Sequence, residues 1–270
     1  MILINGIEED KIAVTDRGLT YGDGVFRTLA ARGGKPLCWR LHYAKLRGDC
    51  ERLGIPAPGE NILLDEIASV AQDMTECVIK IIVTRGQGTR GYTLPLPAQP
   101  TRIVIRSPLP NYPAENTDKG IKARICELRL ADQPRLAGVK HLNRLENVLA
   151  RAEWNDSRIA EGLLLDQHGN IIEGVMSNLF ILRSGVLLTP DLSRCGVAGA
   201  TRERILAWAD QTGIPAKIQD IPLNTLWDAE EVMVCNSLIG VWQIREIDKS
   251  GKIWERGTLT PSIREYLAKY

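Results

Sequence analysis

Three short segments of this 270-residue chain carry side chains whose types and spacing could do chemistry. Residues 138–147 include an amine, at Lys140. Residues 173–180 begin with a carboxylate, at Glu173. Residues 196–202 place two glycines directly before a stretch with helical periodicity. The backbone N–H groups at the start of such a helix can bind an anion, so the three segments offer an amine, a carboxylate and an anion cradle.

These are the parts that a protein must supply to hold and use pyridoxal phosphate. The amine reacts with the aldehyde, the carboxylate pairs with the pyridine nitrogen, and the N–H groups of Ala200 and Thr201 bind the phosphate with the helix dipole behind them. Each part alone has a plainer interpretation. Lys140 could be a solvated surface charge, Glu173 an exposed strand-end residue, and Thr201 an ordinary helix N-cap. Their order along the chain supports the cofactor hypothesis.

A fourth glycine pattern, Gly86 to Gly91, matches the dinucleotide-binding motif G-x-G-x-x-G and follows an apolar run. That motif works only if a helix opens directly after it. Here Pro95 and Pro97 follow within a few residues and exclude a helix. The sequence therefore does not predict a dinucleotide site.

Composition indicates a globular protein acting on a small molecule. Apolar residues make up 44% and charged residues 25%, which suits one large domain or two ordinary ones. The formal charge is +1, so no overall field attracts nucleic acid or anionic lipid. The six cysteines and three histidines are scattered, so we expect free thiols and no metal site. The first residues lack a basic leader and no apolar run approaches about 18 residues, so we expect a cytoplasmic protein without membrane contact.

Periodicity predicts both strands and helices in the first part of the chain, residues 1–112. It begins with a hairpin that turns at Asn5-Gly6, a favoured two-residue turn. Apolar spacing predicts helices over 41–53 and 60–73, and β-branched runs predict strands over 78–84 and 102–105. Between Ser107 and Gly120, prolines and turn-forming residues interrupt any regular element, so we place the domain boundary near residue 113.

The second domain, residues 113–270, is predicted to contain more strand. A hairpin is expected across His168-Gly169-Asn170. Helices are predicted over 143–154, over 201–211 with Gly213 after its end, and from Pro261 onward. Strands are predicted at 121–130, 163–166, 171–173, 180–182, 186–188, 217–221, 231–235 and 241–247.

The set Lys140, Glu173 to Phe180 and Gly199 to Arg202 resembles the fold-type IV pyridoxal phosphate enzymes. This family includes branched-chain aminotransferases, D-amino acid aminotransferases and aminodeoxychorismate lyases. The resemblance spans essentially the whole chain, because residues 16–26 resemble the family's first loop and residues 42–46 its phosphate-contacting helix. Within the family, residues 138–147 and 84–92 look most like aminodeoxychorismate lyase.

The resemblance implies a small N-terminal α/β domain and a larger, barrel-like C-terminal domain with helices, and it places the cofactor in the cleft between them. It also implies a homodimer whose partner subunit completes the site. It implies that Lys140 binds the cofactor covalently and serves as the general base, while Glu173 keeps the pyridine nitrogen protonated. Further cofactor contacts are implied for Lys45, Asn178, Ala200, Thr201 and Ser237. The family commonly has arginine where this chain has Lys45, so Arg47 could reach the phosphate in its place.

The implied reaction converts 4-amino-4-deoxychorismate to 4-aminobenzoate and pyruvate, a step of folate biosynthesis. Because that substrate is a dicarboxylate, we expect Arg85 and Arg90 to bind its carboxylates beside Tyr92, although both arginines could simply be solvated loop residues. One alternative is an aminotransferase for branched-chain or D-amino acids, which would use the same cofactor residues. Another is a non-catalytic cofactor carrier on this fold. The loop from Arg85 to Tyr92 favours an anionic substrate over an aliphatic one.

Overall fold

The computed structural model describes residues 1–269 and divides into two compact units. The first comprises Met1–Pro110 together with Val139–Asn143, and the second comprises Asn111–Gly138 and the chain from Arg144 onward. The short segment 139–143 therefore belongs to the first unit, which a single boundary near residue 113 does not anticipate. This segment contains Lys140.

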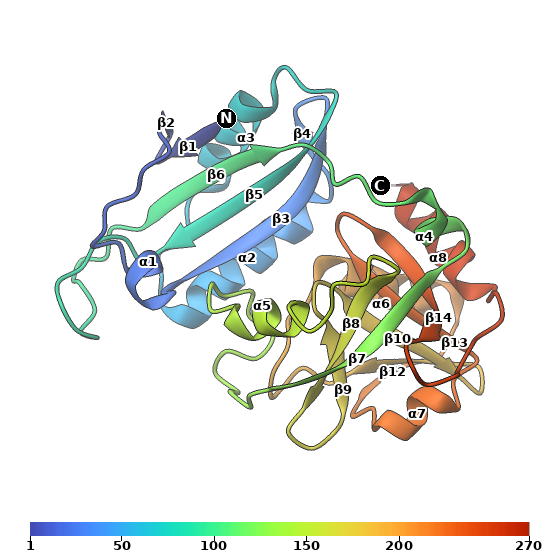
Figure 1. Ribbon diagram of the computed structural model, residues 1–270. Coiled ribbons are helices and arrows are strands. Elements are labelled where there is room, and N and C mark those ends of the chain that lie inside the picture. The colour runs from blue at the N-terminus through green and yellow to red at the C-terminus, as the bar shows by residue number, and fades with distance from the viewer. Residues whose placement is uncertain (270) are drawn as a thin grey trace. The chain divides into compact units, whose positions relative to one another are not determined.

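The first unit is an antiparallel six-stranded sheet in the order β2-β1-β6-β5-β3-β4. Helices α2 and α3 pack on one face of this sheet (Figure 1). A short helix, α1, precedes β3. The bounds are β1 Ile2–Ile4, β2 Ile7–Glu8, α1 Arg17–Tyr21, β3 Gly24–Arg32, β4 Lys35–Pro36, α2 Trp39–Leu53, α3 Glu60–Ala71, β5 Glu76–Thr84 and β6 Thr101–Ser107.

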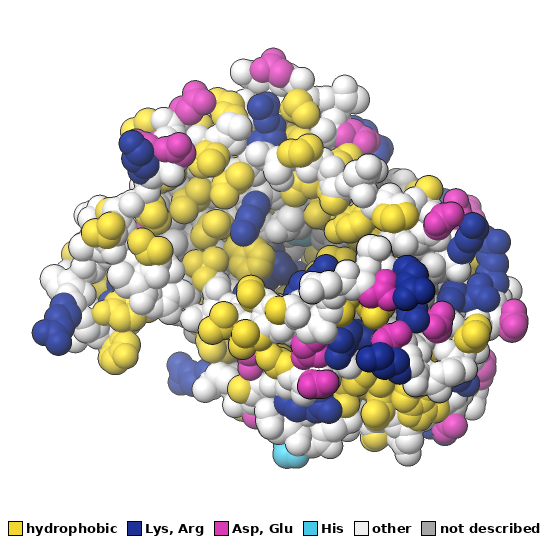
Figure 2. Space-filling view, viewed as in Figure 1, with side chains coloured by type: hydrophobic (Ala, Val, Ile, Leu, Met, Phe, Trp, Pro, Cys, Tyr) yellow, Lys and Arg dark blue, Asp and Glu magenta, His cyan; other side chains and the backbone are white. Residues whose placement is uncertain are grey.

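Alternation along the strands separates the two faces of this sheet. On β3, Val25, Arg27 and Leu29 are buried beneath the helices, while Phe26 and Thr28 point to the other face and are half-buried. Figure 2 shows hydrophobic side chains gathered over this other face, where β5 and β6 also contribute apolar residues. The first unit thus has one fully covered face and one partly exposed apolar face.

The second unit is an eight-stranded sheet in the order β12-β11-β10-β13-β14-β7-β8-β9, and an additional pairing of β10 with β9 makes it barrel-like. Its strands are β7 Ile121–Leu130, β8 Ile159–Asp166, β9 Ile171–Gly174, β10 Asn178–Arg183, β11 Val186–Pro190, β12 Ala216–Gln219, β13 Glu231–Asn236 and β14 Gly240–Ile247. Its helices are α4 Ala114–Asp118, α5 Leu145–Arg151, α6 Ala200–Thr212, α7 Leu223–Trp227 and α8 Leu259–Ala268. The mixed α/β class and the barrel-like second sheet are confirmed.

Most predicted elements are present, with one major omission. The N-terminal hairpin turns at Asn5 and Gly6, as predicted, and their positive φ angles of 51° and 86° are typical of a two-residue hairpin turn. The nine-residue strand β3 was not predicted, because Arg27, Thr28 and several alanines interrupt its apolar pattern. No helix within residues 1–269 is long and apolar enough to span a membrane. The same residues contain no group of three or more potential metal ligands.

Candidate active site

Lys140 lies in the segment 139–143, which runs beside β3 in the first unit. The backbone N–H of Phe26 donates to the Lys140 carbonyl at 2.9 Å. The Lys140 N–H donates to Asp49 Oδ2 at 3.1 Å. Its side-chain Nζ lies 4.5 Å from the centroid of the Phe26 ring. Both backbone polar groups of Lys140 are therefore hydrogen-bonded, and the backbone from which the amine projects is fixed.

Lys45 and Asp49 lie one turn apart on α2, so their side chains share a face of that helix. Asp49 is 9% exposed and forms an ion pair with Arg27 of β3. Burial raises the pKa of the Asp49 carboxyl, although the positive charges of Arg27 and Lys45 act in the opposite direction. Lys45 is half-buried, whereas Arg47 is exposed. Of the two cations considered for the phosphate, Lys45 is the one that shares a helix face with Asp49.

Glu173 lies near the end of β9 and is 3% exposed. Its Oε2 accepts a hydrogen bond from the Val197 N–H at 2.8 Å. The preceding residue, Gly196, has a φ of +84°, and a Cβ there would lie 2.7 Å from Ile172 Cγ2 and 3.4 Å from Glu173 Oε2. Only glycine fits this position without strain, because it combines a left-handed conformation with close packing. The loop that carries the two glycines is thus held against the carboxylate.

The same loop is paired with the residue two positions before Lys140. Gly138 N–H donates to the Gly196 carbonyl at 2.9 Å, and Ala198 N–H donates to the Gly138 carbonyl at 3.0 Å. Lys140 follows Gly138 by two residues, so covalent geometry keeps their Cα atoms within about 7 Å of each other. The hydrogen bonds of Gly138 therefore link the chain leading to Lys140 with the loop that contacts Glu173.

Helix α6 begins at Ala200, directly after this loop. Its N-cap is Gly199, which provides no side-chain acceptor, so the first N–H groups of the helix are available to an external anion. Gly199 N–H donates to Asn178 Oδ1 at 3.0 Å, and Asn178 Nδ2 donates to the Val197 carbonyl at 2.7 Å. Ala200 and Thr201 are 4% and 5% exposed. The structure thus brings Glu173, Asn178, Ala200 and Thr201 together within the second unit.

Ser237 lies in the turn between β13 and β14 and is half-buried. The turn is shaped by Asn236, whose Oδ1 accepts from the N–H groups of Leu238 at 2.8 Å and Ile239 at 2.9 Å. Asn236 Nδ2 also donates to the Met176 carbonyl at 3.0 Å. Asn236 therefore connects the Ser237 turn to the segment between Glu173 and Asn178. Sequence reasoning did not identify this role, although the Asn-Ser pair at a strand end was a signal for it.

Glu161 is a second buried carboxylate that the sequence did not indicate. It lies on β8, is 1% exposed, and accepts hydrogen bonds from the Ser177 hydroxyl at 2.6 Å and the Gly162 N–H at 2.9 Å. Burial raises the pKa of the Glu161 carboxyl above its usual value, although these hydrogen bonds act in the opposite direction. Glu161 supports the turn that separates Glu173 from Asn178.

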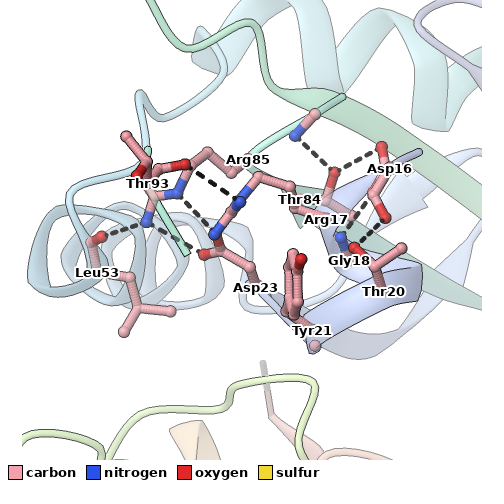
Figure 3. Close-up of polar contacts among 12 residues, drawn as sticks. Asp16, Arg17, Gly18, Thr20, Tyr21, Asp23, Leu53, Thr84, Arg85 and Thr93 are labelled. Carbon is pink, nitrogen blue, oxygen red and sulfur yellow. Dashed lines mark hydrogen bonds and ion pairs between the residues drawn. The ribbon is translucent and has the colours of Figure 1, made fainter. Parts of the chain in front are cut away.

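Arg85 does not have the role predicted for it. It is 4% exposed, and its guanidinium contacts Asp23 twice and donates to the Leu53 carbonyl at 2.7 Å (Figure 3). It also donates to the Gly54 carbonyl at 2.7 Å. The expectation that Arg85 binds a substrate carboxylate is therefore corrected, because its donors are used to tie β5 to the C-terminal end of α2. Arg17 contacts the same Asp23 carboxylate from α1.

The other two predicted substrate residues lie in the loop after Arg85 and are accessible. Arg90 is exposed, and Tyr92 is 84% exposed with its ring centroid 5.4 Å from that of Tyr21. Nothing in the structure assigns them a structural task comparable to that of Arg85. Their contact with a substrate stays a prediction.

Cysteine chemistry is disfavoured in the second unit. Burial raises the pKa of the Cys126, Cys195 and Cys235 thiols to about 12, so these side chains remain protonated at neutral pH. These three thiols are therefore poor nucleophiles at neutral pH.

Comparison with known proteins shows the family to which the chain belongs. The family model described as Amino-transferase class IV matches residues 24–247. The chain belongs to the class IV aminotransferase family. A crystal structure of 4-amino-4-deoxychorismate lyase from Pseudomonas aeruginosa matches this class IV chain with a TM-score of 0.95 and 45% sequence identity, covering 100% of this chain and 98% of that one.

Two curated relatives extend the comparison. Aminodeoxychorismate lyase of Vibrio harveyi is 34% identical over 241 residues, which cover 89% of each chain. A putative branched-chain-amino-acid aminotransferase of Methanocaldococcus jannaschii is 29% identical over 265 residues, covering 96% of this chain and 90% of that protein. The predicted resemblance to the fold-type IV enzymes, and within them to the aminodeoxychorismate lyases, is confirmed. The chain is an enzyme of this class.

Proposed function

We propose that this class IV enzyme uses pyridoxal phosphate to convert 4-amino-4-deoxychorismate to 4-aminobenzoate and pyruvate. The observation that carries the proposal is the pairing of Gly138 with the loop of Gly196 and Ala198, which joins the chain leading to Lys140 to the loop that contacts Glu173. The lyases of Pseudomonas aeruginosa and Vibrio harveyi support the choice of reaction.

The residues present fit this cofactor. Lys140 would hold its aldehyde carbon, Glu173 its pyridine nitrogen, and Lys45 with the first N–H groups of α6 its phosphate. Gly199 is part of the cradle, because a Cβ there would lie 2.2 Å from Asn178 Oδ1 and would displace the side chain that shapes the loop. When bound, the cofactor supplies an electron sink for the bond that breaks at the amine-bearing carbon.

The reaction removes a proton from the amine-bearing ring carbon and breaks the neighbouring carbon–oxygen bond to the enolpyruvyl group. The ring becomes aromatic, and the enolpyruvate takes up a proton to give pyruvate. Lys140 would take the first proton as general base and return one to the departing group as general acid. Glu173 would pair with the pyridine nitrogen and keep it protonated. Arg90 and Tyr92 are proposed to contact the substrate.

The test is formation of 4-aminobenzoate, followed by its fluorescence, when the purified enzyme is mixed with 4-amino-4-deoxychorismate. Product that disappears with Lys140→Ala, and persists with Lys122→Ala as a matched lysine control, would support the proposal. Lys122 of β7 serves as the control because it already pairs with Glu246 and Asp248. Normal turnover by Lys140→Ala would overturn the assignment of Lys140.

The second candidate is an aminotransferase for branched-chain or D-amino acids, favoured by the Methanocaldococcus jannaschii relative and by D-alanine aminotransferase of Staphylococcus epidermidis at 29% identity. It would require the same cofactor residues. Absence of 4-aminobenzoate, together with amino-group transfer from an amino acid to a 2-oxo acid, would decide for it.

We also propose that the enzyme is a homodimer. Leu145, Val148 and Leu149 lie on one face of α5 and are 68%, 61% and 53% exposed, and Leu96 in the loop before β6 is 91% exposed. Exposed apolar side chains grouped on one helix face, as on α5, commonly mark a protein interface. The molar mass in solution, measured by light scattering, tests this proposal. A monomeric mass at micromolar concentration would refute it.

A further inference from the structure

Asp49 connects three elements of the first unit through one carboxylate oxygen. It lies on α2, and its Oδ2 accepts hydrogen bonds from Arg27 of β3 and from the backbone N–H of Lys140, the latter at 3.1 Å. The side chains of Arg27 and Asp49 are only 3% and 12% exposed. The hydrogen bonds are therefore shielded from water, where they are most effective at fixing geometry.

We propose that Asp49, oriented by Arg27, is a positioning residue that holds the backbone of Lys140 so that its amine reaches the cofactor aldehyde. This inference rests on the proposed cofactor role of Lys140. The carbonyl of Lys140 is already held by the Phe26 N–H, so the contact with Asp49 fixes the second of its two backbone polar groups. Displacing such a reactive group by about 1 Å can cost up to about 100-fold in rate.

The same helix carries Lys45, four residues before Asp49, so α2 contributes to both attachments of the cofactor. Lys45 is the proposed phosphate ligand, and Asp49 sets the position of Lys140, the proposed point of covalent attachment. The spacing between the two follows from the helix itself, since residues four apart lie one turn apart on the same face. Asp49 thereby fixes Lys140 relative to the phosphate-binding helix.

A second carboxylate–arginine pair, whose carboxylate is buried and whose arginine is half-buried, provides a control. Glu66 of α3 is 7% exposed and pairs with Arg102 of β6 at 2.7 Å. It joins a helix to the same sheet as Asp49 does, but it makes no contact with the segment 139–143. A purely structural effect of losing a buried pair should therefore be similar at both positions.

The test compares two double variants that both remove the charged pair, since an unpaired buried arginine would itself destabilise the protein. Asp49→Asn with Arg27→Met keeps a side-chain oxygen that can accept from the Lys140 N–H. Asp49→Leu with Arg27→Met removes it. Glu66→Leu with Arg102→Met is the control. When the wild-type enzyme is loaded with pyridoxal phosphate and reduced with borohydride, the reduced cofactor must be found attached to Lys140.

The measured quantity is the ratio of affinities for pyridoxal phosphate and pyridoxamine phosphate, obtained by competing the two on each loaded enzyme. Pyridoxamine phosphate has no aldehyde and cannot link to Lys140, so its binding reports the rest of the site. We expect the ratio to fall by about 10-fold or more in the Asp49→Leu variant and to stay within about 3-fold of wild type in the Asp49→Asn variant and the control.

An unchanged ratio in the Asp49→Leu variant, or an equal fall in the Glu66→Leu control, would overturn the inference while leaving the proposed function in place. Failure of the wild-type enzyme to be labelled at Lys140 would overturn the proposed function and this inference with it. If the Asp49→Leu variant does not yield folded protein, Asp49→Ala in the same Arg27→Met background makes the same comparison.

Discussion

Replacement of Arg85 by methionine should destabilise the enzyme strongly without removing a substrate contact. Arg85 donates to Asp23 at 2.8 and 3.1 Å and to two carbonyls at the end of α2, and it is 4% exposed. Breaking a buried ion pair from one side costs about 3–5 kcal/mol. Because Arg17 remains on Asp23 at 2.8 Å, we expect the lower value, about 3 kcal/mol.

Thermal unfolding of Arg85→Met and of Arg90→Met would measure this effect. A loss of about 3 kcal/mol lowers the midpoint by about 10 °C in a protein of this size. Arg90 is exposed, so its replacement should change stability by less than about 0.5 kcal/mol. We expect Arg85→Met to keep its KM within a few-fold at 25 °C. An unchanged midpoint with a clearly raised KM would refute the structural role and restore Arg85 as a carboxylate ligand.

The pH dependence of the stability difference between wild type and Arg85→Met provides a second check. Burial alone would raise the pKa of Asp23, but hydrogen bonds and charges from Arg85 and Arg17 outweigh it and hold that pKa below 3.8. A carboxyl with a lowered pKa stabilises the fold above its unfolded pKa and loses that contribution as the pH falls through its folded pKa. The stability difference between wild type and Arg85→Met should therefore be constant at neutral pH and narrow below pH 3.8.

Three further changes test the second unit. Gly199→Ala should weaken cofactor binding by about 10-fold, measured by fluorescence titration, because the new Cβ displaces Asn178 and its hydrogen bonds to the loop. Glu173→Gln should lower kcat by about 100-fold and leave the loop intact, since the amide oxygen can still accept from the Val197 N–H. A clear fall in the thermal unfolding midpoint of Glu173→Gln would contradict the second part of this prediction. Glu161→Gln should cost about 1–3 kcal/mol in urea unfolding, because both of its oxygens accept hydrogen bonds. Because burial raises the pKa of the folded Glu161 carboxyl, its ionisation costs stability once the pH rises above 4.5, so the stability advantage of wild type over Glu161→Gln should shrink as the pH rises.

The parts of the site that the sequence predicted are those encoded locally. The periodic stretch after the glycines predicted a helix that the structure shows as α6, and the hairpin spacing placed Glu173 near the end of a short strand. Each of these features depends on residues within about ten positions of one another. Local propensity and periodicity are sufficient for such features.

The parts that the sequence missed depend on pairing between distant segments. Arg85 belongs to a predicted loop, and only the fold places it beside Asp23, 62 residues earlier. Asp49 and Lys140 are 91 residues apart and meet because segment 139–143 pairs with β3, a strand whose mixed polarity concealed it. An arginine in a polar loop has the same local signature whether it binds a substrate or a buried carboxylate. Burial separates the two cases, and burial is a property of the fold.

The residues proposed to react, Lys140 and Glu173, are held largely through backbone hydrogen bonds and through the loops beside them. Lys140 is held by hydrogen bonds to its N–H and carbonyl, and Glu173 is held against a loop N–H. Loop position depends on glycines, which allow the close approach that Gly196 and Gly199 show. An extra methyl group at either glycine should therefore disturb the site more than many substitutions among solvent-exposed polar residues. The backbone positions of Lys140 and Glu173 therefore depend on a few hydrogen bonds to neighbouring backbone and side-chain groups.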